Sequence, residues 1–113
     1  VDYQYCPFCR RIATLQFDEE RSNEHAVVFE PPQPCTPGHL LVVYRFHIER
    51  ATESAYATGK TMELAAEVAG PLGDVNIITS VGELATQTLK HLHVHVVPRR
   101  GDDGLHLPWT PPQ

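Results

Sequence analysis

The sequence predicts an α+β domain, in which one main helix covers one side of an antiparallel β-sheet. Short runs of β-branched and aliphatic residues alternate with turn-forming residues, as strands and their connections do. Residues 48–69 place apolar side chains at helical spacing and end at a Gly-Pro pair. The proline-rich loop of residues 31–38 joins two predicted strands with no helix between them, which favours antiparallel pairing.

Length and composition predict one globular domain over residues 1–113, since 42% of the residues are hydrophobic and 20% are charged. No apolar run approaches the roughly 20 residues of a membrane helix, and the N-terminus does not resemble a signal peptide. A cytoplasmic location is therefore expected. The net charge of −5 argues against a broad basic face for extended nucleic acid, but it leaves room for a small anionic ligand in a local pocket.

Residues 1–12 contain a CxxC knuckle, Cys6-Pro7-Phe8-Cys9. Such a pair can place both sulfurs on one zinc ion or act as a redox pair. A thioredoxin-like redox pair needs a preceding strand, and too little chain precedes Cys6 for one. The metal alternative needs two further ligands from elsewhere. The third cysteine, Cys35, is interpreted as a small apolar side chain in a loop.

The remaining elements follow in order along the chain. Residues 25–30 and 39–44 predict strands, the second of them buried, and residues 74–80 predict a third. The helix of residues 48–69 is expected to bury the following side chains: Ala51, Ala55, Met62, Leu64, Ala65, Ala66, Val68 and Ala69. Residues 81–85 predict a turn, and residues 101–113 an extended tail. Exposed edge strands often pair across a two-fold axis, so a homodimer is expected.

Residues 86–100 contain three histidines at alternate positions, His91, His93 and His95, separated by apolar residues. Side chains two apart in a strand share a face, so this spacing predicts a row of three imidazoles above an apolar core face. A half-buried strand that merely carries histidines is the alternative. Histidine is a poor strand former and titrates between pH 5 and 8, which favours a metal site, a nucleophilic or acid/base centre, or both.

The run of residues 91–97, HLHVHVV, resembles the signature of the histidine triad superfamily, His-φ-His-φ-His-φ-φ with φ apolar. Further blocks resemble that family in the same order along the chain. They are the CPFC knuckle, PGHLLVV at residues 37–43, Gly82-Glu83 with Gln87-Thr88, and Pro98-Arg99. The resemblance is to zinc-containing members of bacterial or phage type, and it implies their α+β fold. The short length argues against galactose-1-phosphate uridylyltransferases, which look like two fused copies of this unit.

The resemblance implies a nucleotide hydrolase or transferase. Such enzymes act at the α-phosphate of nucleoside phosphoramidates, dinucleoside polyphosphates or nucleotide sugars. His93 matches the family nucleophile, and His95 and His39 match the phosphate-contacting positions. Gln87 and Thr88 match positions that bind phosphate and leaving group, and His95 or Thr88 is the candidate general acid. Two alternatives stay open: a nucleotide-binding or scaffold protein with little turnover, and a DNA-end adenylate hydrolase, which the lack of a basic extension disfavours.

The resemblance also implies a nucleoside site, for which a purine nucleoside phosphate is the expected ligand. Its candidate residues are Phe8, Ile12 and Phe29 for the base, Glu30 for the ribose, Ser80 where asparagine is common, and Trp109 in a tail that reaches a partner subunit in some members. Phe8, Ile12 and Phe29 could equally be core residues. The spacing from Glu30 to His39 is one residue longer than usual, and Thr86 replaces a common glycine.

In zinc-carrying members the CxxC pair is completed by two histidines, which here correspond to His47 and His91. Two thiolates and two neutral imidazoles form the closed tetrahedral set of a structural zinc site. Cys6 and Cys9 with His47 and His91 are therefore the predicted metal ligands, with zinc as the cofactor. A metal-free pair of thiols is the alternative.

Overall fold

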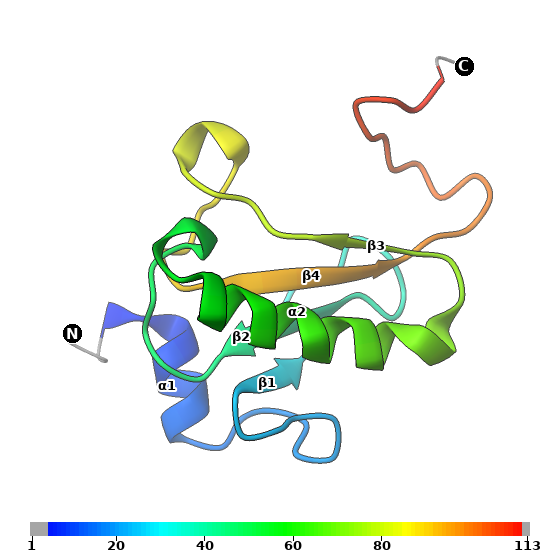
Figure 1. The fold of residues 1–113 in the computed structure, drawn as a ribbon. Helices are drawn as coiled ribbons and strands as arrows, with labels where there is room; N and C mark the ends of the chain where they lie inside the picture. The colour runs from blue at the N-terminus through cyan, green and yellow to red at the C-terminus, as the bar shows by residue number, and fades with distance from the viewer. Residues whose placement is uncertain (1–4, 112–113) are drawn as a thin grey trace.

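The computed structural model describes residues 5–111, so the predictions for residues 1–4 and 112–113 lie outside it. Its centre is a four-stranded antiparallel sheet in the order β1-β2-β4-β3 (Figure 1). The strands are Ala26–Phe29 (β1), Leu40–Tyr44 (β2), Val75–Ile78 (β3) and His93–Pro98 (β4). This architecture, with one main helix against the sheet, confirms the predicted α+β class. β1 and β3 form the two edges of the sheet.

Helix α2, Ala55–Ala69, covers one face of the sheet. It begins later than predicted, because the Ser54 side chain caps it by accepting a hydrogen bond from the Ala57 amide at 3.0 Å. A separate 3₁₀ turn, Ala51–Glu53 (η2), precedes it. The buried positions 57, 61, 64, 65 and 69 follow helical spacing. That face excludes positions 55 and 66, which are exposed, contrary to the prediction.

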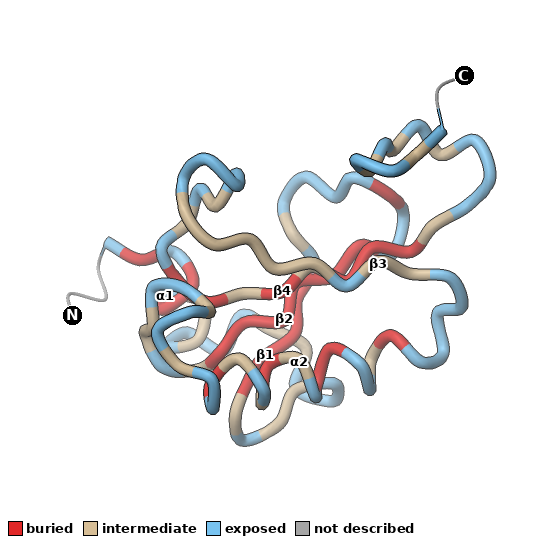
Figure 2. The backbone as a smooth tube through the Cα atoms, turned by 45° about the horizontal axis from the view of Figure 1, so that its top comes forward, coloured by how far each residue is buried: buried red, intermediate tan, exposed pale blue. Residues whose placement is uncertain are grey.

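The main core lies between α2 and the sheet. Buried residues, red in Figure 2, lie along β1, β2 and β4, and alternate residues of these strands pack with the helix. They include Val28, Val42, Val94 and Val96, each 0% exposed, and they pack with Leu64 and Ala65. The period of two along β4 therefore puts Val94 and Val96 in the core, and His93 and His95 on the opposite face.

A short helix that the sequence did not predict, α1, spans Pro7–Ala13 and lies against the opposite face of the sheet. Pro7 occupies its first position, and the Cys6 sulfur caps it by accepting from the Cys9 amide at 3.4 Å. Phe8 and Cys9 are buried in a second core cluster with Phe29. The expectation of a sheet covered on one side is therefore incomplete, since both faces are covered at this end.

Strand β4 begins at His93, so the prediction of three histidines within one strand is wrong for His91. His91 lies in the approach to β4. The Leu92 amide donates to the Ile48 carbonyl at 2.6 Å, and the Leu92 carbonyl accepts from the Tyr44 amide at 3.2 Å. These bonds fix the approach against the end of β2. His93 and His95 lie opposite Val43 and Leu41 in the β2 register.

Two further 3₁₀ turns lie in the connections around the sheet. α2 passes through the 3₁₀ turn Gly70–Leu72 (η3) into β3, and the 3₁₀ turn Glu83–Ala85 (η4) lies in the loop between β3 and β4. Thr86 closes that loop with φ at +72°, in the left-handed region. Glycine adopts this conformation at little cost, whereas other residues adopt it less readily. None of the helices within residues 5–111 has the length and apolar character to cross a membrane.

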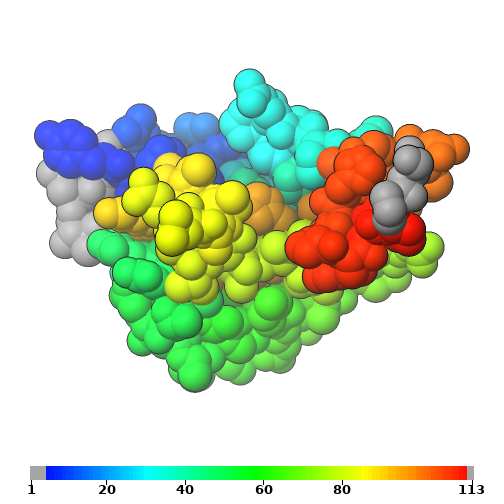
Figure 3. All heavy atoms as spheres, turned by 90° about the horizontal axis from the view of Figure 1, so that it is seen from above, coloured from blue at the N-terminus to red at the C-terminus, as the bar shows by residue number. Residues whose placement is uncertain are grey.

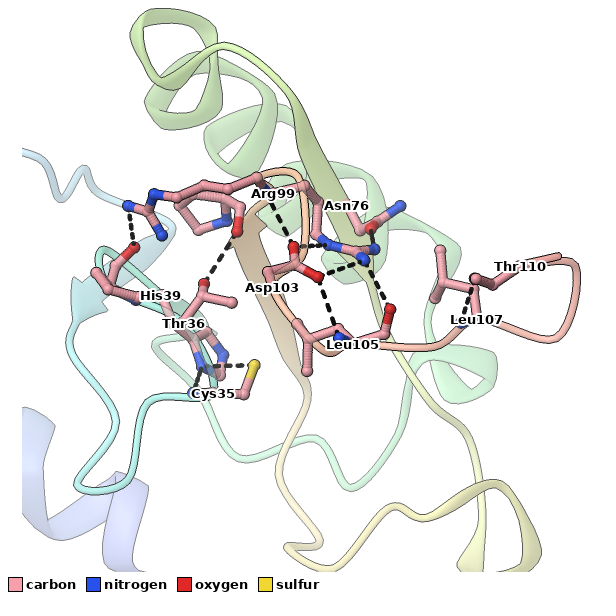
Figure 4. A network of polar contacts seen from close by, with 12 residues as sticks. Cys35, Thr36, His39, Asn76, Arg99, Asp103, Leu105, Leu107 and Thr110 are labelled. Atoms are coloured by element: carbon pink, nitrogen blue, oxygen red, sulfur yellow. Dashed lines mark hydrogen bonds and ion pairs between the residues drawn. The ribbon is translucent and has the colours of Figure 1, made fainter. Parts of the chain in front are cut away.

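Arg99 attaches the C-terminal segment to the sheet (Figure 4). Its guanidinium donates to both Asp103 carboxylate oxygens at 2.7 and 3.1 Å, to Asn76 Oδ1 on β3 at 2.6 Å, and to the Leu105 carbonyl at 2.8 Å. The hydrogen bonds from Arg99 and from the Arg100 and Leu105 amides hold the pKa of Asp103 well below its usual range. The predicted tail therefore starts from a fixed turn at residues 99–105.

Candidate active site and metal centre

The four predicted metal ligands come together at the start of β4. The sulfurs of Cys6 and Cys9 and the Nδ1 atoms of His47 and His91 all lie within 4.8 Å of one another. The Cys6–His91, Cys9–His47 and Cys9–His91 contacts measure 3.3, 3.3 and 3.5 Å. Ligands of one tetrahedral zinc, bound at about 2.0–2.3 Å, lie about 3.3–3.8 Å apart. The donor set and its spacing therefore fit a closed zinc site.

The protonation of His91 supports the same conclusion. Its side chain is 0% exposed, and its Nε2–H donates to the Tyr44 carbonyl at 2.7 Å, so the Nδ1 lone pair faces the two sulfurs. Burial lowers the pKa of His91 to about 4, which keeps the ring neutral. Burial and the neighbouring Cys6 raise the pKa of the Cys9 thiol to about 12. A bound cation would stabilise the Cys9 thiolate that this environment otherwise disfavours.

His93 lies next along the chain, with a ring orientation suited to nucleophilic attack. Its Nδ1–H donates to the His91 carbonyl at 2.7 Å, which leaves the lone pair on Nε2. The edge-to-face contact with Phe8, at 5.1 Å between ring centroids, holds the ring from the side. Burial lowers the pKa of His93, and the bond to the His91 carbonyl opposes that shift only in part. At neutral pH the ring is therefore uncharged.

His39 and His95 form a hydrogen-bonded pair whose direction the backbone sets. Gly38, at φ +88°, turns the chain into His39, and the Cys35 amide donates to His39 Nδ1 at 3.1 Å. His39 Nε2 then carries the proton and donates to His95 Nδ1 at 3.0 Å. The remaining proton of His95 is on Nε2. Cys35, whose contact with His39 appears in Figure 4, lies in the loop between β1 and β2 and is exposed.

The same pair predicts an acid-sensitive stability. Burial and the charges of His93 and His39 lower the pKa of His95 to about 4, and burial lowers that of His39. Unfolded histidine titrates near 6.5, so the unfolded chain takes up protons first as the pH falls. The free energy of unfolding should therefore decrease from pH 6.5 through pH 4.

Urea denaturation at pH 7, 6, 5 and 4 measures this decrease. The His95→Gln variant should show a shallower pH dependence than the original chain, and the comparison removes the contribution of the metal ligands that both chains share. Equal slopes for the two chains would contradict the predicted role of His95.

Gln87 and Thr88 lie in the loop before β4 and not on the sheet. The Gln87 Oε1 atom accepts from the Gly82 amide at 3.0 Å, and its Nε2 donates to the Glu49 and Leu89 carbonyls at 2.7 and 3.0 Å. Gln87 therefore holds its own loop together and joins it to the segment between β2 and α2. Thr88 is exposed and lines, with Gln87, a cavity of about 600 Å³. No contact found within residues 5–111 joins either side chain to His93 or His95.

Most of the predicted nucleoside residues lie beside Phe8. Phe8 contacts Phe29 edge-to-face at 5.6 Å, and Ile12 packs against the same cluster. Phe29 and Glu30 line a second cavity, of about 530 Å³. Arg11, which the sequence analysis did not select, lines it too. In the sequence, the only feature that could have indicated Arg11 is its place in the arginine pair that follows the CPFC knuckle.

Ser80 and Trp109 are the other two residues predicted for the nucleoside site. Ser80 is partly exposed, and its neighbour Thr79 donates to the His93 carbonyl at 2.8 Å. Trp109 is 75% exposed, and no contact found among the described residues joins it to the histidines. Figure 3 shows the loop of residues 81–88 (yellow), the loop of residues 30–38 (cyan) and the C-terminal segment (red) on one face of the molecule.

Comparison with known proteins identifies the family. The model of the HIT domain matches residues 21–102, which include β1 to β4 and the three histidines of the triad. The chain belongs to the HIT domain family.

HIT relatives cover most of the chain. It is 31% identical to Protein hit from Bacillus subtilis over 92% of this chain and 78% of that protein. It is 26% identical to an adenosine 5'-monophosphoramidase from Saccharomyces cerevisiae over 92% of this chain and 69% of that protein. Its fold matches that of a zinc-bound histidine triad family protein from Mycobacterium smegmatis, with a TM-score of 0.74 and 26% identity, over 93% of this chain and 82% of that one.

Proposed function

We propose that this HIT protein is a nucleotide hydrolase or transferase that acts at the α-phosphate of a nucleoside phosphoramidate or dinucleoside polyphosphate. The observation that carries the proposal is the 2.7 Å bond from His93 Nδ1 to the His91 carbonyl, because it exposes the Nε2 lone pair of a neutral imidazole. A neutral imidazole is a competent nucleophile at pH 7. The S. cerevisiae relative, named an adenosine 5'-monophosphoramidase, supports the substrate class.

In the first step His93 Nε2 attacks the α-phosphorus and forms a P–N bond. The bond from phosphorus to the leaving nitrogen or oxygen breaks, and the leaving group takes the electron pair. His95 in its protonated form, which the neighbouring anionic phosphate favours, is the candidate donor, through Nε2–H, of the proton that the leaving group needs. Positive charge on the His93 ring is balanced by the phosphate and by the His91 carbonyl that accepts its Nδ1–H. The product is a nucleotidyl-histidine and a free leaving group.

In the second step a water molecule, or another acceptor in a transferase, attacks the same phosphorus. The P–N bond breaks and its electron pair returns to His93 Nε2. The proton of the attacking water passes to His95 Nε2, which the first step left deprotonated. His39 orients His95 for this exchange, because a hydrogen bond of 3.0 Å joins His39 Nε2 and His95 Nδ1. Nucleoside monophosphate is released and both histidines recover their starting protonation.

Zinc is proposed as a structural cofactor. Cys6 and Cys9 with His47 and His91 would hold it, and the closed set of four protein ligands leaves no position for substrate. When bound, the ion anchors α1 to the approach of β4. The zinc-bound M. smegmatis structure supports this assignment.

A homodimer and a cytoplasmic location remain predictions. β3 forms an edge of the sheet and exposes Ile77, which is compatible with pairing to a second copy. Trp109, on the exposed tail, is the candidate to reach the partner's site. Sedimentation equilibrium tests the dimer, and a monomeric mass at micromolar concentration would contradict it.

Hydrolysis in water enriched in oxygen-18 tests the proposed attack at the α-phosphate. The heavy oxygen should appear in the phosphate of the nucleoside monophosphate and be absent from the leaving group. Mass spectrometry of the products of a dinucleoside polyphosphate gives the answer directly. Label found only in the other product would show attack at a different phosphorus.

The alternative function is nucleotide binding with little turnover. A panel of nucleoside phosphoramidates and dinucleoside polyphosphates separates the two functions. Tight binding of nucleoside monophosphate without product release from any substrate would favour the binding protein.

A further inference from the structure

The predicted nucleoside site contains a positively charged side chain, Arg11, although a pocket for an aromatic base requires only apolar contacts. Arg11 extends from α1 so that its guanidinium carbon lies 4.2 Å from the centroid of the Phe29 ring. This cation–π contact fixes the guanidinium over a buried aromatic face. Arg11 Nη1 donates to the Gln16 carbonyl at 3.3 Å. A guanidinium has five N–H donors, so most of them stay available at the edge of the group.

Two arginines, Arg11 and Arg21, line the cavity of about 530 Å³ beside Phe29, and they differ in their ion pairs. Arg21 is paired with the Asp18 carboxylate at 2.9 Å. Arg11 has a neutral carbonyl partner and takes part in none of the ion pairs found within residues 5–111. Its charge is therefore not compensated by a carboxylate, and a ligand with hydrogen-bond acceptors can use it.

Aromatic contacts connect this cavity to the proposed nucleophile. The Phe8 ring contacts His93 at 5.1 Å on one side and Phe29 at 5.6 Å on the other, and Arg11 follows at 4.2 Å from Phe29. A nucleotide whose α-phosphate lies at His93 can therefore extend along Phe8 and bring its base toward Arg11. This step depends on the proposed function.

The chemistry of the bases then decides which nucleotide fits. Guanine presents two adjacent acceptors, O6 and N7, which match the fork of an arginine. Adenine presents a donor, N6–H₂, next to N7, and an arginine cannot bind that pair through two donors. Pyrimidines lack N7. We propose that Arg11 is a specificity-determining residue that makes this site select guanine nucleotides over adenine nucleotides.

Calorimetric titration of the full chain with GMP and with AMP tests the proposal. GMP should bind about tenfold more tightly or better, as expected for a bidentate arginine contact. In Arg11→Met this ratio should fall to about one, mainly through weaker GMP binding. Arg11→Lys keeps the charge but not the fork, so it should also lose the preference. Arg10→Met is the matched control on the same helix, because Arg10 is exposed and does not line the cavity.

Three results would overturn the proposal. The first is equal binding of GMP and AMP to the original chain, which needs no variant and so stands even if Arg11→Met does not fold. The second is an unchanged ratio in Arg11→Met and Arg11→Lys. The third is tighter binding of both nucleotides by Arg11→Met, because Arg11 would then block the base. If neither nucleotide binds the original chain, the proposed function fails as well, whereas equal binding with turnover leaves that function intact.

Discussion

Replacing His93 by alanine should abolish turnover of a nucleoside phosphoramidate or dinucleoside polyphosphate. The side chain supplies the nucleophile, so a decrease in kcat of about 10⁴-fold or more is expected, as for other covalent nucleophiles. Binding of nucleoside monophosphate should persist, because Phe8 and Phe29 do not depend on the His93 ring for their own contact at 5.6 Å. Steady-state kinetics and calorimetric titration on the same preparation measure the two effects separately.

The control is His25→Ala. His25 is a histidine outside the site, where it pairs with Glu24 at 3.3 Å and contacts the Tyr56 ring. Its replacement should leave kcat and nucleotide binding within about twofold, in line with the small effects of surface substitutions. Retained turnover in His93→Ala would refute the assignment of the nucleophile. Loss of turnover in both variants would point to general damage to the fold.

Removal of zinc should lower the free energy of unfolding by about 4 kcal/mol or more, which corresponds to free zinc at a thousand times its dissociation constant. The chain prepared without added zinc should contain one ion per chain by elemental analysis. Cys6→Ser and Cys9→Ser should lose the metal and the same stability, because each removes one of the four ligands. Urea denaturation, with and without a chelator, measures the change.

Cys35→Ser is the matched control for these two variants. Cys35 is the third free cysteine and is not among the four clustered ligands. Its replacement should leave zinc content and unfolding unchanged. A near-zero zinc content in the original chain, together with a stability that chelator does not alter, would exclude the structural zinc site.

The alternation of histidine and aliphatic residues predicted a large part of the fold and the site. A period of two along a strand determines which side chains share a face, and Val94 and Val96 lie in the core as that period requires. The protonation of the histidines could not be predicted in this way. His91 and His93 each donate to a backbone carbonyl, while His39 accepts from a backbone amide, and the alternation of residue types does not report which backbone group a ring faces.

Two features escaped the sequence analysis for different physical reasons. Helix α1 has only seven residues, too few for a hydrophobic period, and its signals were a capping residue followed by proline. The contribution of Cys35 to the site comes from its backbone amide, which donates to His39, and no side-chain pattern reports a backbone donor. Gln87 shows the opposite case, since its side chain matches a family motif, but its hydrogen bonds go to backbone groups of its own loop and of Glu49.

His91 participates in the two centres through different parts of one residue. Its ring Nδ1 lies in the cluster of metal ligands, and its main-chain oxygen accepts the proton of His93 Nδ1. Any displacement of the His91 backbone changes both distances at once. The metal centre and the nucleophile are therefore mechanically coupled through a single residue. The position of the attacking nitrogen, His93 Nε2, depends on the contacts that hold the CxxC knuckle against His91.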